Sequence, residues 1–174
     1  MCLVSSIFIS CSDKSKMISQ IEGCIQKTFN DPNSYQNIEY RIDTITINDI
    51  VYCEILSLQI QYESDSTSLI QEKEILELNR GFNQFFDVSK DIKECETNIK
   101  MYENKCRNIL SQIKELRLKP KNNNIAYYIV FDSYRAKNGL GGYIKGVETY
   151  YFNTNIEILN TNQLYSLKEK FLKL

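Results

Sequence analysis

The sequence contains no histidine and no tryptophan, and only two of its 174 residues are proline. Without histidine, Ser-His-Asp and Cys-His catalysis and every histidine-ligated metal site are excluded. The charges nearly cancel, because 21 basic and 22 acidic residues give a net charge of −1, so bulk charge does not select nucleic acid as a partner. No apolar run reaches the roughly 18–20 residues that a membrane-spanning helix needs. We therefore expect no catalytic residues, no metal ligands and no cofactor.

The composition that remains is that of a folded protein. Apolar residues make up 43% of the chain, charged residues 25% and aromatic residues 11%. These proportions suit one globular domain of ordinary size, alone or with an appendage, and they exclude a disordered tail. The sequence shows no internal repeat.

The most specific local signal lies at the N-terminus. Residues 3–9 form an apolar run that is followed by Ser10 and Cys11. A small residue before a cysteine, behind an apolar stretch, is typical of a bacterial lipobox, in which the signal peptide is cut off before a cysteine that then carries lipid. The pattern predicts a truncated signal-peptide-like segment at residues 1–10, lipidation of Cys11 and a cell-envelope location. No basic residue precedes the run, which a start codon further upstream would explain. The alternative is a cytosolic first strand with Cys11 as a buried thiol.

The next segments read as a helix and two strands. Apolar residues at three- and four-residue spacing predict a helix over residues 14–29, with Asp13 as its N-cap. Pro32 and its polar neighbours predict a turn at residues 30–34. Alternation predicts a strand over residues 35–46 with a bulge near Asp43, and an aromatic-rich run predicts a second strand over residues 50–62.

The period then changes to that of a coiled coil. Helices are predicted at about residues 66–86 and 89–118, and they should fold as an antiparallel hairpin. In the first helix the expected apolar stripe is Ile75, Leu78, Phe82 and Phe85. In the second, nine residues spaced alternately by four and three form a seam: Val88, Ile92, Cys95, Ile99, Tyr102, Cys106, Ile109, Ile113 and Leu116.

The C-terminal third returns to strands. Residues 125–134 are apolar on both alternating faces, which predicts a central strand. Residues 143–152 predict a fourth strand, residues 156–159 a continuation of the sheet, and residues 163–172 a short helix. The expected fold is α+β, with the N-terminal helix packed on a roughly four-stranded antiparallel meander. The coiled-coil-like hairpin is inserted between strands two and three, at about residues 66–118 of a single domain over residues 11–174.

A basic, glycine-rich segment connects the last two predicted strands. Its residues Arg135, Lys137, Asn138, Gly141 and Gly142 offer cations and backbone N–H groups that could cradle an anion or contact a partner. The alternative is an ordinary hairpin loop whose glycines adopt positive φ. A strand follows the segment where a dinucleotide-binding loop requires a helix, which favours the hairpin.

The cysteines and carboxylates offer little chemistry. Cys95 and Cys106 lie too far apart on one helix to form a disulfide and are interpreted as small buried side chains, whereas Cys24 and Cys53 could pair if their elements cross. No cysteine spacing matches a zinc site. Five acidic residues lie in or beside the predicted sheet, and we interpret them as a solvated face: Asp31, Glu39, Asp43, Glu54 and Asp132.

Two short motifs carry a family resemblance. The segment Asp31-Pro32-Asn33-Ser34-Tyr35 and the later segment Tyr134-Arg135-Ala136-Lys137-Asn138, which continues to Gly141-Gly142, resemble motifs of small Bacteroidota lipoproteins of unknown function. The order of lipobox, helix, first motif, strands, charged helical stretch and second motif also agrees. The resemblance implies an envelope location and this architecture, and it implies no activity. Asp31, Pro32, Ser34 and Tyr35 are interpreted as a structural turn, with Arg135 and Asn138 hydrogen-bonding to the loop backbone or to the Asp31 carboxylate.

Three functions follow as hypotheses. The first is a lipid-anchored envelope protein that binds an unidentified protein or envelope component without catalysis, and that meets the membrane through its lipid alone. The second is a cytosolic or mobile-element interaction protein that uses the helical hairpin for partner binding or dimerisation. The third is a histidine-free enzyme that uses carboxylates or the segment 135–142. We favour the first, because the sequence offers no catalytic constellation.

Overall fold

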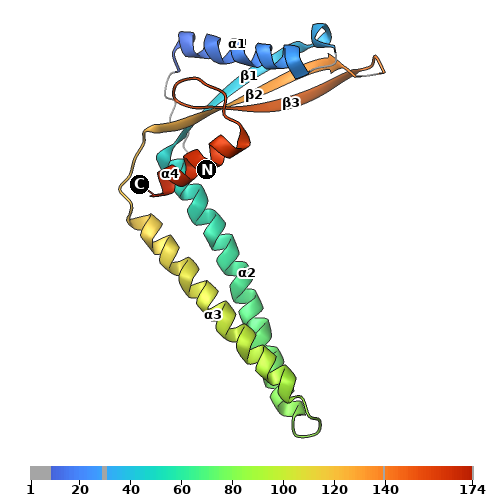
Figure 1. Ribbon diagram of the computed structural model, residues 1–174, viewed down its shortest axis with the longest axis vertical. Helices are drawn as coiled ribbons and strands as arrows, with labels where there is room; N and C mark the ends of the chain where they lie inside the picture. The colour runs from blue at the N-terminus through green and yellow to red at the C-terminus, as the bar shows by residue number, and fades with distance from the viewer. Residues whose placement is uncertain (1–8, 29–30, 139, 174) are drawn as a thin grey trace. The chain divides into compact units, whose positions relative to one another are not determined.

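The structure is a computed structural model that describes residues 9–28, 31–138 and 140–173. These residues form four helices, a short 3-10 turn and a three-stranded antiparallel sheet (Figure 1). The predicted α+β class is therefore confirmed. The described residues fall into two compact units, one made of the chain up to Ile50 and from Asn122 onward, the other of Val51–Lys121.

The first unit is built on the sheet, whose strand order is β1-β2-β3. The strands are β1 (Gln36–Thr46), β2 (Ile125–Lys137) and β3 (Tyr143–Phe152). β2 is the central strand, as its two apolar faces predicted. Helix α1 (Cys11–Thr28) covers one face of the sheet, and α4 (Thr161–Lys173) packs on the other (Figure 1).

From Tyr127 onward, alternate residues of β2 belong to two different cores. On the α1 face, Met17, Ile21 and Ile25 are at most 2% exposed and pack on the sheet around Val130 and Phe152, which are fully buried. On the opposite face, a smaller core joins the start of α2 and α4 to the sheet through Ile50, Ala126, Tyr127 and Leu164. Burial of these side chains is the main source of stability of the first unit.

Four local predictions in this unit are wrong. The helix N-cap is Ser10 and not Asp13, because the Ser10 hydroxyl accepts the Asp13 N–H at 3.1 Å and donates to its carboxylate at 2.8 Å. The register of β1 shifts at Asn37/Glu39 and at Ile45/Thr46, not near Asp43. The sheet has three strands, because the predicted second strand is helical. Residues 156–159 add a single bridge from Phe152 to Ile158 and no continuing strand.

The predicted strand over residues 50–62 belongs to helix α2 (Ile47–Phe82). A reciprocal cap starts this helix, since Asp49 Oδ2 accepts the Thr46 N–H at 2.8 Å and the Thr46 hydroxyl accepts the Asp49 N–H at 3.2 Å. The apolar and aromatic residues that suggested a strand lie on two sides of the helix. A helix that is apolar on two sides loses the one-sided periodicity by which helices are recognised in a sequence.

The second unit consists of α2 from Val51 onward and α3 (Ser89–Leu118), whose predicted boundaries are confirmed. All nine predicted seam residues of α3 are buried or half-buried. They face a matching seam on α2 that has the same alternating spacing of four and three: Val51, Ile55, Leu58, Tyr62, Asp65, Leu69, Glu72, Leu76 and Asn79. The stripe predicted for α2 at Ile75, Leu78, Phe82 and Phe85 is wrong, because all four side chains are exposed.

Candidate functional site

The two motifs singled out in the sequence meet at one end of the sheet. Ser34, in the 3-10 turn η1 (Pro32–Ser34), accepts a hydrogen bond from the Lys137 N–H at 3.0 Å and donates one to the Asp31 carbonyl at 2.8 Å. The rings of Tyr35 and Tyr134 lie 5.6 Å apart. The interpretation of residues 31–35 as a structural turn is thus supported, although the junction is made by Ser34 and Tyr35 and not by the Asp31 carboxylate.

Beneath this junction lies a fully buried carboxylate, Asp132 on β2. The Tyr35 hydroxyl lies 2.7 Å from both carboxylate oxygens, and the Asn37 amide donates to Oδ1 at 2.9 Å. The Tyr40 hydroxyl lies 3.3 Å from that of Tyr35 and extends the network. These hydrogen bonds from Tyr35 and Asn37 tie the segment after the turn to the central strand. Because both carboxylate oxygens accept hydrogen bonds and the side chain is shielded from water, Asp132 is not placed to act as a base on a substrate.

The interpretation of the acidic residues as a solvated face is therefore wrong for Asp132. It holds for Asp31 and Glu39, which are exposed, whereas Asp43 and Glu54 are half-buried. Asp43 forms an ion pair with Arg41 at 3.3 Å. In the described part of the chain, no group of three or more cysteine or acidic side chains is arranged to hold a metal ion.

Burial raises the pKa of several tyrosines in the first unit. Burial is the largest cause for Tyr35, followed by its hydrogen bonds to Tyr40 and Asp132, and together they raise its pKa far above the ordinary value. Burial also raises the pKa of Tyr150, with the charges of Glu148 and Asp132 adding to the effect. The pKa of Tyr128 and that of Tyr134 are raised mainly by burial. In the folded state these hydroxyls therefore keep their protons at pH values where free tyrosine ionises.

This difference predicts alkaline destabilisation of the first unit. Below pH ~10 the tyrosines are protonated in both states and their contribution is fully present. Above that pH the unfolded chain releases protons that the folded chain retains, so stability should fall as pH rises. Urea unfolding measured between about pH 8 and 11 should show this loss, and Tyr35→Phe should make it smaller. Tyr165→Phe, which changes a 63% exposed ring, should leave the slope unchanged. If the slope of stability against pH is the same in Tyr35→Phe as in the unchanged chain, the raised pKa of Tyr35 does not cause the alkaline loss.

The glycine-rich segment is a hairpin loop and not an anion cradle. Asn138 Oδ1 accepts the N–H groups of Leu140 at 3.0 Å and Gly142 at 2.9 Å, and the Gly141 N–H donates to the Asn138 carbonyl at 2.9 Å. Gly141 has φ of +82°, which confirms the predicted positive φ. The described N–H groups of Leu140, Gly141 and Gly142 are thus used within the loop. The prediction that Asn138 bonds to the loop backbone is confirmed.

Arg135 and Lys137 lie on the sheet face opposite α1, and both are exposed. The Arg135 guanidinium lies 4.4 Å from the centre of the Tyr143 ring, and the Lys137 ammonium lies 5.7 Å from it. Lys145 is the register partner of Arg135 on β3. Arg135 therefore stacks on an aromatic ring instead of joining Asp31, and the two predicted site cations sit beside a third on an open sheet surface.

Cys11, the predicted lipidation residue, is the first residue of α1 and is exposed. The two residues before it are part of the folded unit, because Ile9 packs against the α1 core and Ser10 caps the helix. Cleavage before Cys11 would remove both contacts.

The other described cysteines have no assigned chemistry. Cys95 and Cys106 are buried in the α2–α3 seam, as predicted. Cys24 is half-buried on α1 and Cys53 is exposed on α2, and no disulfide joins these two. The hypothesis of a Cys24–Cys53 pair is therefore not supported.

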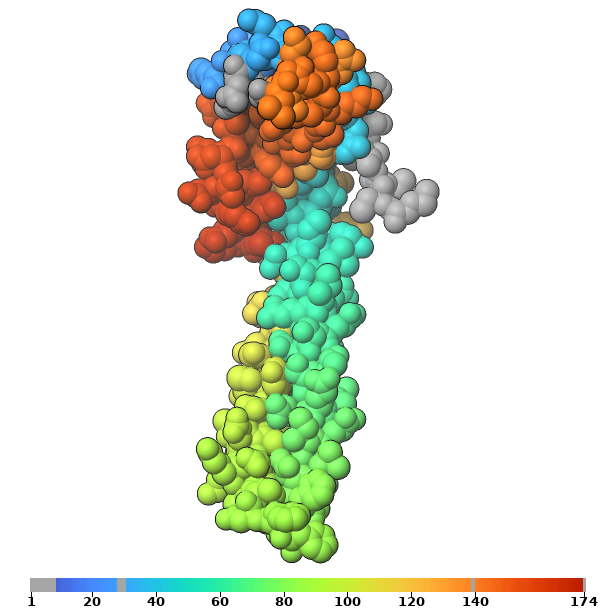
Figure 2. Space-filling model, turned by 90° about the vertical axis from the view of Figure 1, so that its right-hand side faces the viewer, coloured from blue at the N-terminus to red at the C-terminus, as the bar shows by residue number. Residues whose placement is uncertain are grey.

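The sequence analysis missed the main exposed apolar surface, which lies on α2. We call it the outer face of α2 and define it by six side chains that are 40–69% exposed: Tyr52, Leu56, Ile60, Ile70, Leu78 and Phe82. Because each helical residue advances by about 100°, Leu56, Ile60, Ile70 and Leu78 lie on the side of α2 away from its seam with α3, and Tyr52 and Phe82 lie on the two flanks of that side. Figure 2 views the second unit with α2 in front of α3. In the sequence these residues form a second apolar stripe along the helix, and this stripe obscured the stripe that packs on α3.

Comparison of the chain with protein-family models, with curated proteins and with solved structures finds no match. Within the described ranges, no helix combines the length and the apolar character that crossing a membrane requires.

Proposed function

We propose that the chain is a non-catalytic interaction protein whose second unit binds an amphipathic helix of a partner protein on the outer face of α2. The observation that carries the proposal is the row of six large apolar side chains on that face. Contiguous exposed apolar surface is typical of interaction sites in soluble proteins. An apolar stripe along a helix is the surface that a second amphipathic helix recognises.

The small core of the second unit supports this proposal. The α2–α3 seam buries Leu58, Leu76, Ile109 and Ile113 together with two cysteines, and it places Asp65, Glu72 and Asn79 among them. Two helices can cover only one side of each other, so the outer face of α2 stays in water. A third helix would cover this face and give α2 apolar neighbours on both sides.

The envelope location remains a separate proposal. It rests on the lipobox-like Ser10-Cys11 and on the resemblance to Bacteroidota lipoproteins, which the motifs at residues 31–35 and 134–142 carry. The interaction proposal depends on neither, since a helical recognition surface serves an anchored protein as well as a cytosolic one.

A synthetic helix peptide tests the interaction proposal. The probe has about four heptads with leucine on one face and glutamine elsewhere, and its binding to the full chain is measured by fluorescence anisotropy. The double variant Ile60→Glu/Leu78→Glu should weaken binding by about 100-fold or more, because two apolar contacts are replaced by charges. Both residues are exposed, so the variant should keep its helical circular dichroism.

The matched control is Met101→Glu/Leu110→Glu, which places the same two charges on exposed positions of α3. This control should bind the peptide as the unchanged chain does. Equal weakening by both double variants, or no binding of the peptide to the unchanged chain, would contradict the proposal.

A further inference from the structure

The charges of the second unit are divided unequally between its helices. α2 has two basic and seven acidic residues, whereas α3 has seven basic and five acidic ones. Both cations of α2 are engaged by α3, since Lys73 pairs with Glu103 at 3.0 Å and Arg80 with Glu96 at 3.3 Å. The acidic residues of α2 therefore outnumber its two cations, and both cations are already paired in the described structure.

Two of these acidic residues lie within the outer face of α2. Glu63 and Glu74 are exposed and stand between the apolar residues of the row, and neither takes part in an ion pair in the described structure. Glu77 lies beside them and pairs with Arg80 of its own helix at 3.0 Å. A partner helix that packs on the apolar row must therefore approach these carboxylates.

An open hollow on the same face has the geometry that receives a side chain of a packed helix. It has a volume of about 630 Å³ and is lined by Ile70, Lys73, Glu74, Glu77 and Leu78. The first four stand at i, i+3, i+4 and i+7, which is the spacing of the four residues that surround one inserted side chain in a coiled coil. An apolar side chain seated there would lie beside Glu74 and Glu77, within reach of cations on the same partner helix.

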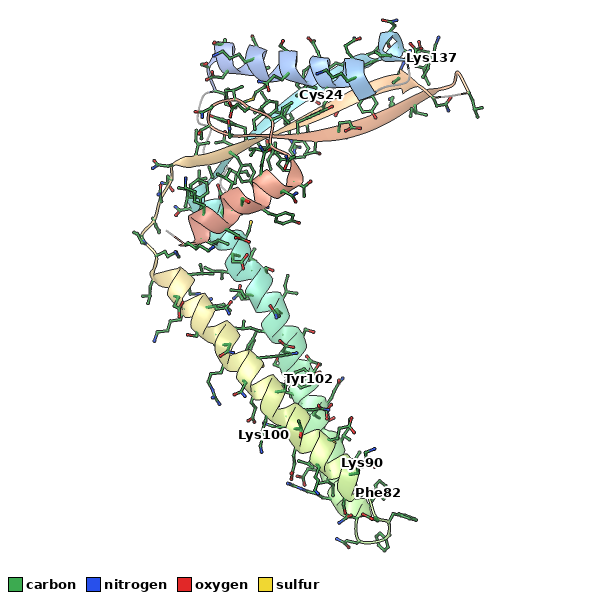
Figure 3. The ribbon with its side chains drawn as sticks, in the orientation of Figure 1. Cys24, Phe82, Lys90, Lys100, Tyr102 and Lys137 are labelled. Atoms are coloured by element: carbon green, nitrogen blue, oxygen red, sulfur yellow. The ribbon has the colours of Figure 1, made fainter. Side chains whose placement is uncertain are left out.

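The acidic charge argues against a second copy as the occupant. Packing α2 against α2 of another copy would bring two faces that each carry Glu63 and Glu74 together, and like charges at a helix interface are unfavourable. The basic residues of the second unit that form no ion pair in the described structure lie on α3 or just after it, among them Lys100 of α3, which points away from α2 (Figure 3). These cations are therefore not placed to neutralise the carboxylates on the outer face of α2.

We infer that the occupant is a basic amphipathic helix, in which lysine or arginine side chains flank the apolar edge that packs on the outer face of α2. This inference rests on the proposed function and adds the chemistry of the partner. The apolar row supplies the affinity, and the carboxylates select the partner by charge.

Peptides that share one apolar face and differ in charge test the inference. The glutamine peptide described above is compared with versions that carry lysine or glutamate in place of glutamine. The lysine peptide should bind the full chain about tenfold or more tightly than the glutamate peptide at low salt, and the difference should shrink as ionic strength rises. Glu63→Gln/Glu74→Gln should reduce this preference, whereas the matched control Glu94→Gln/Glu115→Gln on α3 should keep it.

The outcomes separate this inference from the proposed function. If the three peptides bind equally, the basic partner is wrong while the interaction function stands. If none binds, the interaction function fails as well. If the full chain sediments as a dimer that Ile60→Glu/Leu78→Glu dissociates, a second copy covers the face and the inference is overturned.

Discussion

Replacing Phe152 with alanine is expected to lower the free energy of unfolding of the first unit by about 3–5 kcal/mol. Phe152 is the largest fully buried side chain and lies in the core between α1 and the sheet. Its register partner on the central strand is Tyr128, and α1 contributes Met17, Ile21 and Ile25 to the same core. Removing the ring would leave a cavity among the side chains of α1, β2 and β3. The packed backbone of these elements prevents the side chains from moving far enough to fill it.

Urea unfolding, monitored through the amide hydrogen exchange of β2 and β3, measures this loss in the free energy of unfolding. Val147→Ala is the control, because Val147 lies on the same strand and is 64% exposed. It should change the free energy of unfolding by less than about 0.5 kcal/mol. A loss below about 1 kcal/mol for Phe152→Ala would show that this core is not the main support of the unit.

Replacing Asp65 with leucine is expected to stabilise the second unit by about 1–4 kcal/mol. Asp65 occupies a seam position of α2, and its Oδ2 is buried without a hydrogen-bond partner among the described residues. Its nearest cation, Lys105 of α3, is 4.0 Å away and half exposed. A charge held in this way loses water without gaining a strong partner, whereas leucine would fill the seam with apolar contacts.

Hydrogen exchange of α3 amides, with and without urea, measures the gain. Asp65→Asn is the control, because it removes the charge but leaves a buried polar group, and it should give a smaller gain than leucine. Losing the Asp65 carboxylate should cost Lys105 little free energy, because its ammonium stays in contact with water and lies over the Tyr102 ring. If Asp65→Leu is less stable than the unchanged chain, the ion pair between Asp65 and Lys105 stabilises the unit more than its 4.0 Å separation indicates.

The sequence predicted best where one period dominates a segment. The nine-residue seam of α3 and the boundaries of that helix follow from one uninterrupted heptad pattern, and the structure buries or half-buries every residue of the seam. β3 was predicted at its observed bounds, between a glycine-rich connection and a turn at residues 153–155. Local preferences and tertiary packing agree in these two segments.

Prediction failed where two environments are superimposed on one segment. α2 packs on α3 with one side and exposes apolar residues on the other, so its first turns were predicted as a strand and its exposed residues Ile75, Leu78 and Phe82 were predicted as its packed stripe. Asp132 shows the same limit for the site. Its burial depends on donors from Tyr35 and Asn37, which are distant in sequence and meet it only after β1 pairs with β2.

The sequence by itself determined the α+β class, the central position of β2, the heptad seam of α3 and the absence of histidine chemistry, because each depends on composition or on the period of one segment. Tertiary structure alone decided that Asp132 is buried, that Asn138 satisfies its own loop, and that α2 presents an acidic, apolar face to solvent. These properties depend on which side of each element finds a neighbour. A single sequence states which residues are apolar or charged, but the packing partners decide which of them remain available for binding.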